Sequence, residues 1–214
     1  MMVKNKILIA LIMMVSIFCQ CMAADVVDLF VKAPRSVLPL LDPSTRMDMV
    51  DYYRSGMSTA SSNIMDGHSR VTQLSDSSLT ISVSDASMLQ MVLLPLDKKH
   101  DVLCCIFTLK TPQPDSWVEF YSTDWKKLDA GRYFTEPTVS DWLTREGRKD
   151  EAAALGNIPF MLSSYTCVGL AGKYVLVMKN EMPGYFGNDE YEGMKSWLRP
   201  ELKYVWSGKA FKRQ

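Results

Sequence analysis

The sequence predicts an α+β protein: an N-terminal helix followed by an antiparallel β-meander, then short helices and further antiparallel strands, with the helices packed on one sheet face. Three observations support this class. Residues 25–57 carry helical patterns, whereas apolar and polar residues alternate from about residue 69 onward. The strand-like runs are joined by short turns, which suit antiparallel neighbours because parallel strands need long crossovers. Helices and strands in separate runs are typical of the α+β class.

The stretch DPSTRMDMVDYYRSGM, residues 42–57, combines many charges with a helical pattern. Asp42 before Pro43 suits a helix N-cap, and Gly56 suits a C-terminal stop. At about 100° per residue, one side of this helix carries Met49, Val50, Tyr52 and Tyr53, and the opposite side carries Asp48, Asp51 and Arg54. Met47 does not fit this pattern. Arg46 falls on the apolar side, so we predict that its guanidinium binds a partner at the edge of that side.

The first group of strands contains two segments that need cover on both faces. Residues 79–83 alternate as a half-buried strand does, but residues 88–94 and 102–109 are apolar on both faces, as central strands are. Helices can cover one face. The other face needs a second layer formed by residues 159–206, another subunit or an apolar ligand.

After residue 137 the sequence predicts two short helices, at 139–143 and 150–155. It also predicts three more strands, at 159–168, 173–179 and 202–206. Segment 183–193 is rich in glycine and aromatic residues, so we predict a loop there. We expect the tail 210–214 to be frayed. We interpret residues 24–214 as a single α+β domain in which 24–137 and 138–214 could be two similar halves.

The first 23 residues predict a signal peptide. Lys4 and Lys6 precede the apolar run 7–18, which is too short for a comfortable membrane span. Small residues then favour cleavage after Ala23. A retained anchor is the alternative.

Lipidation of Cys19 or Cys21 is a further alternative, disfavoured because a bulky residue precedes each cysteine. The predicted location is therefore the periplasm or the cell surface.

Charge and motifs exclude several classes of protein. The chain has 24 basic and 24 acidic residues, and removal of the signal peptide leaves a small acidic excess, so we expect no nucleic-acid partner. No segment after residue 23 is long and apolar enough to span a membrane. Phosphate loops, zinc motifs, calcium loops and a serine nucleophile elbow are all lacking in the sequence. We therefore predict no cofactor and no metal.

Three cysteines follow the signal peptide: Cys104, Cys105 and Cys167. Adjacent residues on a strand point to opposite faces, so only one of the first two can meet Cys167. Export would bring them into an oxidising compartment, where disulfides persist. Our candidate bridge is Cys105–Cys167, with Cys104 as the other choice. The alternative is three reduced, buried cysteines.

Four aromatic residues are candidates for ligand binding. Trp125 follows a strand and could stack on a glycan, or it could pack under its loop. Tyr185, Phe186 and Tyr191 form a second group with the same two interpretations.

A family resemblance rests on Pro39-Leu40-Leu41, Arg46, Asp48, Asp51 and Tyr52, and on the stretch 120–125. With these residues the chain resembles an exported protein family of Bacteroidales, domain of unknown function 3256. The resemblance implies the cell envelope of an anaerobic Gram-negative bacterium. It implies no activity, and no functional residues are carried over.

The sequence therefore favours an exported, non-enzymatic binding or interaction module whose partner is an envelope protein, a glycan or an apolar ligand. The alternative is an unrecognised periplasmic hydrolase. Such an enzyme would need His68 or His100 to meet a serine and a carboxylate in a pocket.

Overall fold

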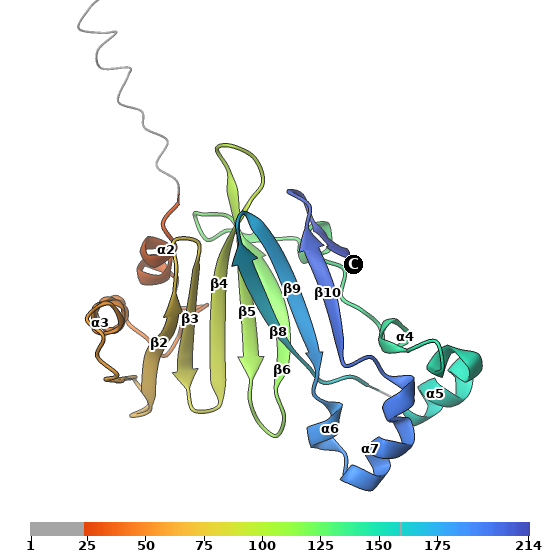
Figure 1. Ribbon diagram of the computed structural model, residues 1–214. Helices are drawn as coiled ribbons and strands as arrows, with labels where there is room; N and C mark the ends of the chain where they lie inside the picture. Colours follow the sequence, from red (N-terminus) through yellow and green to blue (C-terminus); the bar gives the residue numbers. More distant parts are fainter. Residues whose placement is uncertain (1–23, 159) are drawn as a thin grey trace, which may run out of the picture.

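The computed structural model describes residues 24–158 and 160–214 (Figure 1). The predicted signal peptide, its cleavage site after Ala23 and the lipidation candidates Cys19 and Cys21 lie outside the described residues. Within the described part of the chain, no helix is long and apolar enough to cross a membrane.

Two helices and a seven-stranded sheet form the first part of the fold. The helices are α2 (Val26–Lys32) and α3 (Pro43–Arg54). The strands pair in chain order as an antiparallel meander: β1 (Ser61–Ser62), β2 (His68–Leu74), β3 (Ser78–Ser84), β4 (Ser87–Pro95), β5 (Asp101–Leu109), β6 (Asp115–Tyr121) and β7 (Lys127–Leu128).

Short helices and a four-stranded antiparallel sheet form the second part. The sheet has the order β11-β10-β9-β8. The elements are α4 (Val139–Trp142), α5 (Glu151–Asn157), β8 (Ser163–Leu170), β9 (Lys173–Asn180), α6 (Met182–Tyr185), α7 (Asn188–Met194), β10 (Glu201–Trp206) and β11 (Phe211–Arg213).

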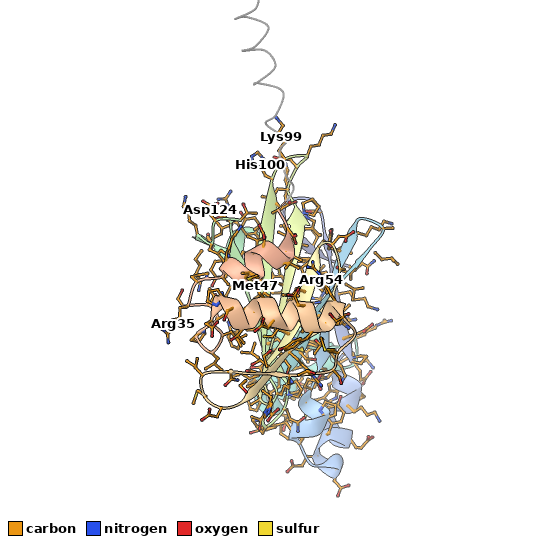
Figure 2. All side chains as sticks on the ribbon, turned by 90° about the vertical axis from the view of Figure 1, so that its left-hand side faces the viewer. Arg35, Met47, Arg54, Lys99, His100 and Asp124 are labelled. Atoms are coloured by element: carbon orange, nitrogen blue, oxygen red, sulfur yellow. The ribbon has the colours of Figure 1, made fainter. Side chains whose placement is uncertain are left out.

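The two sheets and the N-terminal helices form three layers (Figure 1). Figure 2 shows α2 and α3 lying across one face of the larger sheet, with Met47 and Arg54 on α3. On that face Met91 and Cys105 pack with α2 and α3, whereas Val92 and Cys104 pack against the second sheet on the other face. The chain itself therefore covers both faces of the central strands, and the predicted α+β fold is confirmed.

Side chains of the first sheet bind the free edge of β8. The Gln90 side chain donates to the Cys167 carbonyl at 3.0 Å and accepts from the Cys167 N–H at 2.8 Å. Ser116 Oγ accepts from the Tyr165 N–H at 3.0 Å and lies 2.8 Å from Thr108 Oγ1. These buried groups satisfy an edge that would otherwise expose unpaired backbone, and they fix β8 relative to β6.

The cysteine pairing needs correction. Cys104, Cys105 and Cys167 are buried free thiols. Cys105 packs with the helix layer, whereas Cys167 packs in the other cluster, so the sheet separates the two side chains. The predicted Cys105–Cys167 bridge is wrong because the residue that shares a core with Cys167 is Cys104.

Two segments predicted to be irregular are ordered elements. Segment 183–193, predicted as a loop, falls in α6 and α7 except for residues 186–187, and the fully buried Met182 anchors the first turn of α6. The tail predicted to fray forms β11. Phe211 is buried and pairs with Trp206, and Arg213 binds Asp141 at 2.6 Å. Tertiary contacts order both segments despite weak local signals.

Candidate functional site

The candidate site is a cleft beside an open edge of the larger sheet. Strand β7 pairs only with Phe120 and Tyr121, so the first five residues of β6 have no neighbouring strand on that side among the described residues. A cleft of about 480 Å³ lies here, between β6, the start of β8 and the segment that leads into α4. The lining residues that matter chemically are Asp115, Ser116, Glu136, Trp142, Ser163 and Tyr165.

Backbone polarity makes this edge available for pairing. Ser122 donates its N–H to the Lys126 carbonyl at 2.9 Å, and Phe120 pairs with Leu128. The backbone N–H and C=O groups of the even-numbered residues of β6 therefore point toward β7. Backbone groups of antiparallel strands alternate in direction, so the N–H and C=O groups of Ser116 and Val118 point out of the open edge. Among the described residues, neither N–H group donates a hydrogen bond to a turn, a loop or a side chain.

Hydrogen bonds from the start of β8 position the cleft wall. Asp115 Oδ1 accepts from the Ser163 N–H at 3.2 Å, which fixes that carboxylate at the mouth. The Tyr165 hydroxyl lies 3.4 Å from Glu136 Oε1, to which it donates. Burial raises the pKa of Tyr165, and the nearby charges of Glu136 and Asp115 raise it further. Tyr165 is therefore a neutral hydrogen-bond donor beside two carboxylates.

The segment behind Glu136 is held in place by a capped turn. Asp141 accepts from the N–H and the hydroxyl of Thr138, both at 2.9 Å, in a capping box that starts α4. Arg213 donates to the Asp141 carboxylate and to its backbone carbonyl, both at 2.6 Å. Strand β11 thus anchors the turn that carries Glu136 and Trp142.

An apolar surface lies on the opposite face of the same edge. Trp117 alternates with Ser116 and Val118, so its ring lies on the other side of the sheet. The ring stacks on Phe107 with 5.2 Å between centroids and 12° between planes, yet Trp117 remains 42 % exposed. Leu109, 49 % exposed, follows on β5. These three side chains form an apolar patch that the helix layer does not cover.

The charge of the cleft restricts its ligands. Among the residues that line it, two are carboxylates and none is basic. An anionic ligand would meet uncompensated repulsion there, whereas a neutral or cationic ligand would be favoured. The site therefore combines an unpaired sheet edge, an acidic cleft on one face and an apolar patch on the other.

None of the residues predicted to bind a ligand lines this cleft. Arg46, 2 % exposed, donates all its hydrogen bonds to backbone carbonyls at the end of α2 and in the turn that follows, namely those of Phe30, Val31, Ala33, Leu38 and Leu41. Burial lowers the pKa of Arg46, an effect that the Asp42 charge opposes. Its partner is the end of a helix, where cations are favoured.

Trp125 lies under the helix layer and is half-buried. Its Nε1 donates to the Leu29 carbonyl at 3.2 Å, and its ring lies 5.3 Å from that of Tyr121. This geometry favours the packing interpretation of Trp125 over the ligand-stacking one.

The second aromatic group is partly assembled. Tyr185 contacts both Phe160 and Phe186 edge to face, each with 5.3 Å between centroids. Tyr191 instead packs half-buried against the core. Tyr185 is the most exposed of the predicted aromatic residues but lies outside the cleft.

The histidines do not form an aligned catalytic group. His68 is exposed at the start of β2. His100 lies on the β4–β5 turn (Figure 2), where its Nδ1 is 2.9 Å from Asp97 Oδ2, and both side chains are more than half exposed. Ser122 lines the same surface hollow, but within the described chain no hydrogen bond joins it to His100. The described residues also contain no group of three side chains suited to hold a metal.

Two stacked antiparallel sheets with an outer helix layer and an open edge define the protein as an α+β protein with an edge-strand cleft. The chain belongs to the family described as "protein of unknown function (DUF3256)", whose model matches residues 18–211. This confirms the family expected from the sequence.

A solved structure gives independent support for the fold. The chain resembles a domain of an uncharacterized protein from Porphyromonas gingivalis W83, with a TM-score of 0.70 and 22 % sequence identity. The match covers 90 % of this chain and 98 % of that chain. At this identity the likeness shows the fold alone. No functionally curated protein matches the sequence.

Proposed function

We propose that the protein is an exported, non-enzymatic interaction module of the cell envelope that binds an extended segment of another protein at the open edge of β6. The observation that carries the proposal is the unpaired edge at Ser116 and Val118, which opens into an acidic cleft. Extended peptides commonly add a strand to such an edge, with main-chain hydrogen bonds supplying affinity.

The two faces of the edge select the side chains of the added strand. Side chains of a strand alternate between faces, so one residue would enter the acidic cleft and the next would lie on the apolar patch. The cleft favours lysine or arginine because Asp115 and Glu136 line it without a basic neighbour. The patch at Trp117 and Leu109 favours an apolar or aromatic residue. The preferred sequence therefore alternates basic and apolar residues.

Export supports the same assignment from the sequence. The positive and apolar pattern before residue 24 is that of a signal peptide, so the partner would be a protein of the periplasm or the surface.

Calorimetric titration with synthetic peptides tests the proposal. A peptide that alternates lysine with leucine should bind residues 24–214, and a peptide that alternates glutamate with leucine should not. Trp117→Ser should weaken binding about tenfold, as expected for an interface anchor. Tyr185→Ser is the matched control because it removes an exposed aromatic ring outside the cleft. Equal losses in the two variants, or equal binding of the two peptides, would contradict the assignment.

Hydrolysis is the second candidate, favoured by one observation: His100, Asp97 and Ser122 lie around one exposed turn region. Turnover of ester or peptide substrates that His100→Ala abolishes would establish it. Turnover that His100→Ala leaves unchanged would refute this candidate.

A further inference from the structure

The outer face of the four-stranded sheet carries an apolar and basic surface. Strand register places Val168, Val175 and Val205 side by side across three strands, with Lys212 next in the row. Leu170 and Lys173 pair in the adjacent row, at the end of the β8–β9 hairpin. We call these six residues the tip patch.

The charge of the tip patch is uniformly positive. None of its members is acidic, and neither of its lysines forms an ion pair with a described residue. Lys209, in the neighbouring β10–β11 turn, is also exposed and without an ion pair within the described chain. Three lysines therefore surround one apolar tip.

Leu170 projects from a constrained turn. It is 78 % exposed, the highest value among the large apolar side chains of the described chain. The next two residues have positive φ, 50° at Ala171 and 76° at Gly172. Left-handed backbone is unfavourable for alanine, so this tight turn is retained at a cost and keeps the apolar side chain at the end of the hairpin.

We propose that the tip patch docks on a bilayer surface with anionic headgroups. Lysines near such a surface are attracted to it, and one leucine can enter the headgroup region. Three half-buried or exposed valines and one leucine are too few for a stable protein interface. Addition of a second copy along β8 is also disfavoured, because Gln90 and Ser116 occupy that edge.

The position of the N-terminus agrees with this orientation. Ala24 lines a surface hollow with Leu96 and His100, at the same end of the molecule as the two hairpin turns (Figure 1). The predicted signal peptide precedes Ala24 in the sequence, so this is the end that would lie nearest the membrane before cleavage. The β6 cleft lies at the first residues of β6 and β8, away from the tip patch, and remains accessible.

Vesicle sedimentation tests the docking directly. Residues 24–214 hold both hydrophobic cores, so this chain is mixed with vesicles of phosphatidylglycerol and phosphatidylcholine, or of phosphatidylcholine alone. We expect binding to the anionic vesicles only, decreasing as salt rises. Replacing Lys173, Lys209 and Lys212 with glutamine should weaken binding by up to about a hundredfold, roughly fivefold for each lysine. Replacing Arg35, Arg54 and Arg145 with glutamine is the control of equal charge.

A second variant separates the apolar contribution from charge. Leu170→Asp should abolish sedimentation, whereas Met65→Asp should not, although Met65 is 73 % exposed in the β1–β2 turn of the other sheet. Circular dichroism should show both variants folded, because each replaced side chain lies at the surface. No sedimentation of the wild type with anionic vesicles at low salt, equal binding to both vesicle types, or equal losses in matched variants would overturn the proposal. None of these outcomes depends on peptide binding at β6.

Discussion

Replacement of Arg46 with methionine should destabilise the fold strongly. The guanidinium is the sole hydrogen-bond donor in the described chain to the carbonyls of Val31, Ala33 and Leu41. Methionine has a similar length but no donor, so it would leave the buried carbonyls of Ala33 and Leu41 and the part-buried carbonyl of Val31 without a partner.

The size of the stability loss follows from the carbonyls that lose their hydrogen-bond donor. A buried polar group left unsatisfied costs about 1–3 kcal/mol, so the two buried carbonyls together cost about 2–6 kcal/mol, and the part-buried carbonyl of Val31 adds less. Methionine also removes the cost of burying the guanidinium charge, which reduces the net loss in the free energy of unfolding, because replacing a buried charge with a hydrophobic residue is neutral in some proteins. We expect a net loss of about 3 kcal/mol, a large fraction of a typical stability of about 5–15 kcal/mol.

Urea unfolding followed by circular dichroism measures this loss. Arg54→Met is the matched control: Arg54 is exposed in the same helix, and its replacement should change the free energy of unfolding by less than about 0.5 kcal/mol. If Arg46→Met stays within about 1 kcal/mol of the wild type, the carbonyl contacts do not hold the helix layer as described.

Three further outcomes are expected. Gln90→Ala should lower the free energy of unfolding by about 2–4 kcal/mol because it leaves the buried N–H and C=O of Cys167 without a hydrogen-bond partner. Replacing the exposed Gln73 with alanine should have little effect in the same urea titration. Burial raises the pKa of Tyr165 in the folded state. Its contribution to stability is therefore fully present below the ordinary tyrosine pKa of about 10 and is lost as pH rises above that value, where the unfolded chain ionises first. Tyr165→Phe should therefore flatten the alkaline part of a stability-against-pH curve. Burial raises the pKa of Cys167 to about 12 and also raises the pKa of Cys104 and of Cys105. In residues 24–214, a thiol reagent should therefore label no cysteine in the folded state and three in denaturant. Fewer than three labelled thiols in denaturant would show that a bridge exists.

Local patterns predicted much of the first sheet and its helices. Asp42 caps α3 by accepting from the N–H groups of Ser44 and Thr45, both at 2.9 Å, as its place before Pro43 predicts. The bonds from the N–H and the hydroxyl of Thr45, followed by that from the Ser44 hydroxyl, lower the pKa of Asp42 to about 2. The apolar runs on both faces correctly indicated two covering layers, because a strand buried on both sides has no polar alternation.

Long-range contacts decided what local patterns could not. The free edge of β6 exists because β7 is only two residues long and pairs at one end, which no periodicity reveals. Glu136 and Tyr165 come together from separate elements, so neither stands out alone. The sequence carried one usable signal for this site: Trp117 is an aromatic residue on the face of β6 opposite to the inward-facing Ser116 and Phe120.

The same limit explains Arg46 and the C-terminal tail. The helical pattern placed Arg46 on the apolar side, but its partners are carbonyls of the preceding helix and turn, which carry no sequence signature. The tail has few apolar residues, yet the Phe211 ring packs edge to face on Trp206 and Phe134, and its N–H donates to the Tyr133 carbonyl at 2.7 Å.

Amide hydrogen exchange at Val118 tests strand addition at β6 most directly. We expect this N–H, which faces the open edge, to exchange rapidly in the free protein and to be protected when the alternating lysine–leucine peptide is bound. Trp117, whose backbone faces β5, should be protected in both states. Peptide binding that leaves Val118 exchange unchanged, or a Val118 amide already protected in the free chain, would contradict the proposed site.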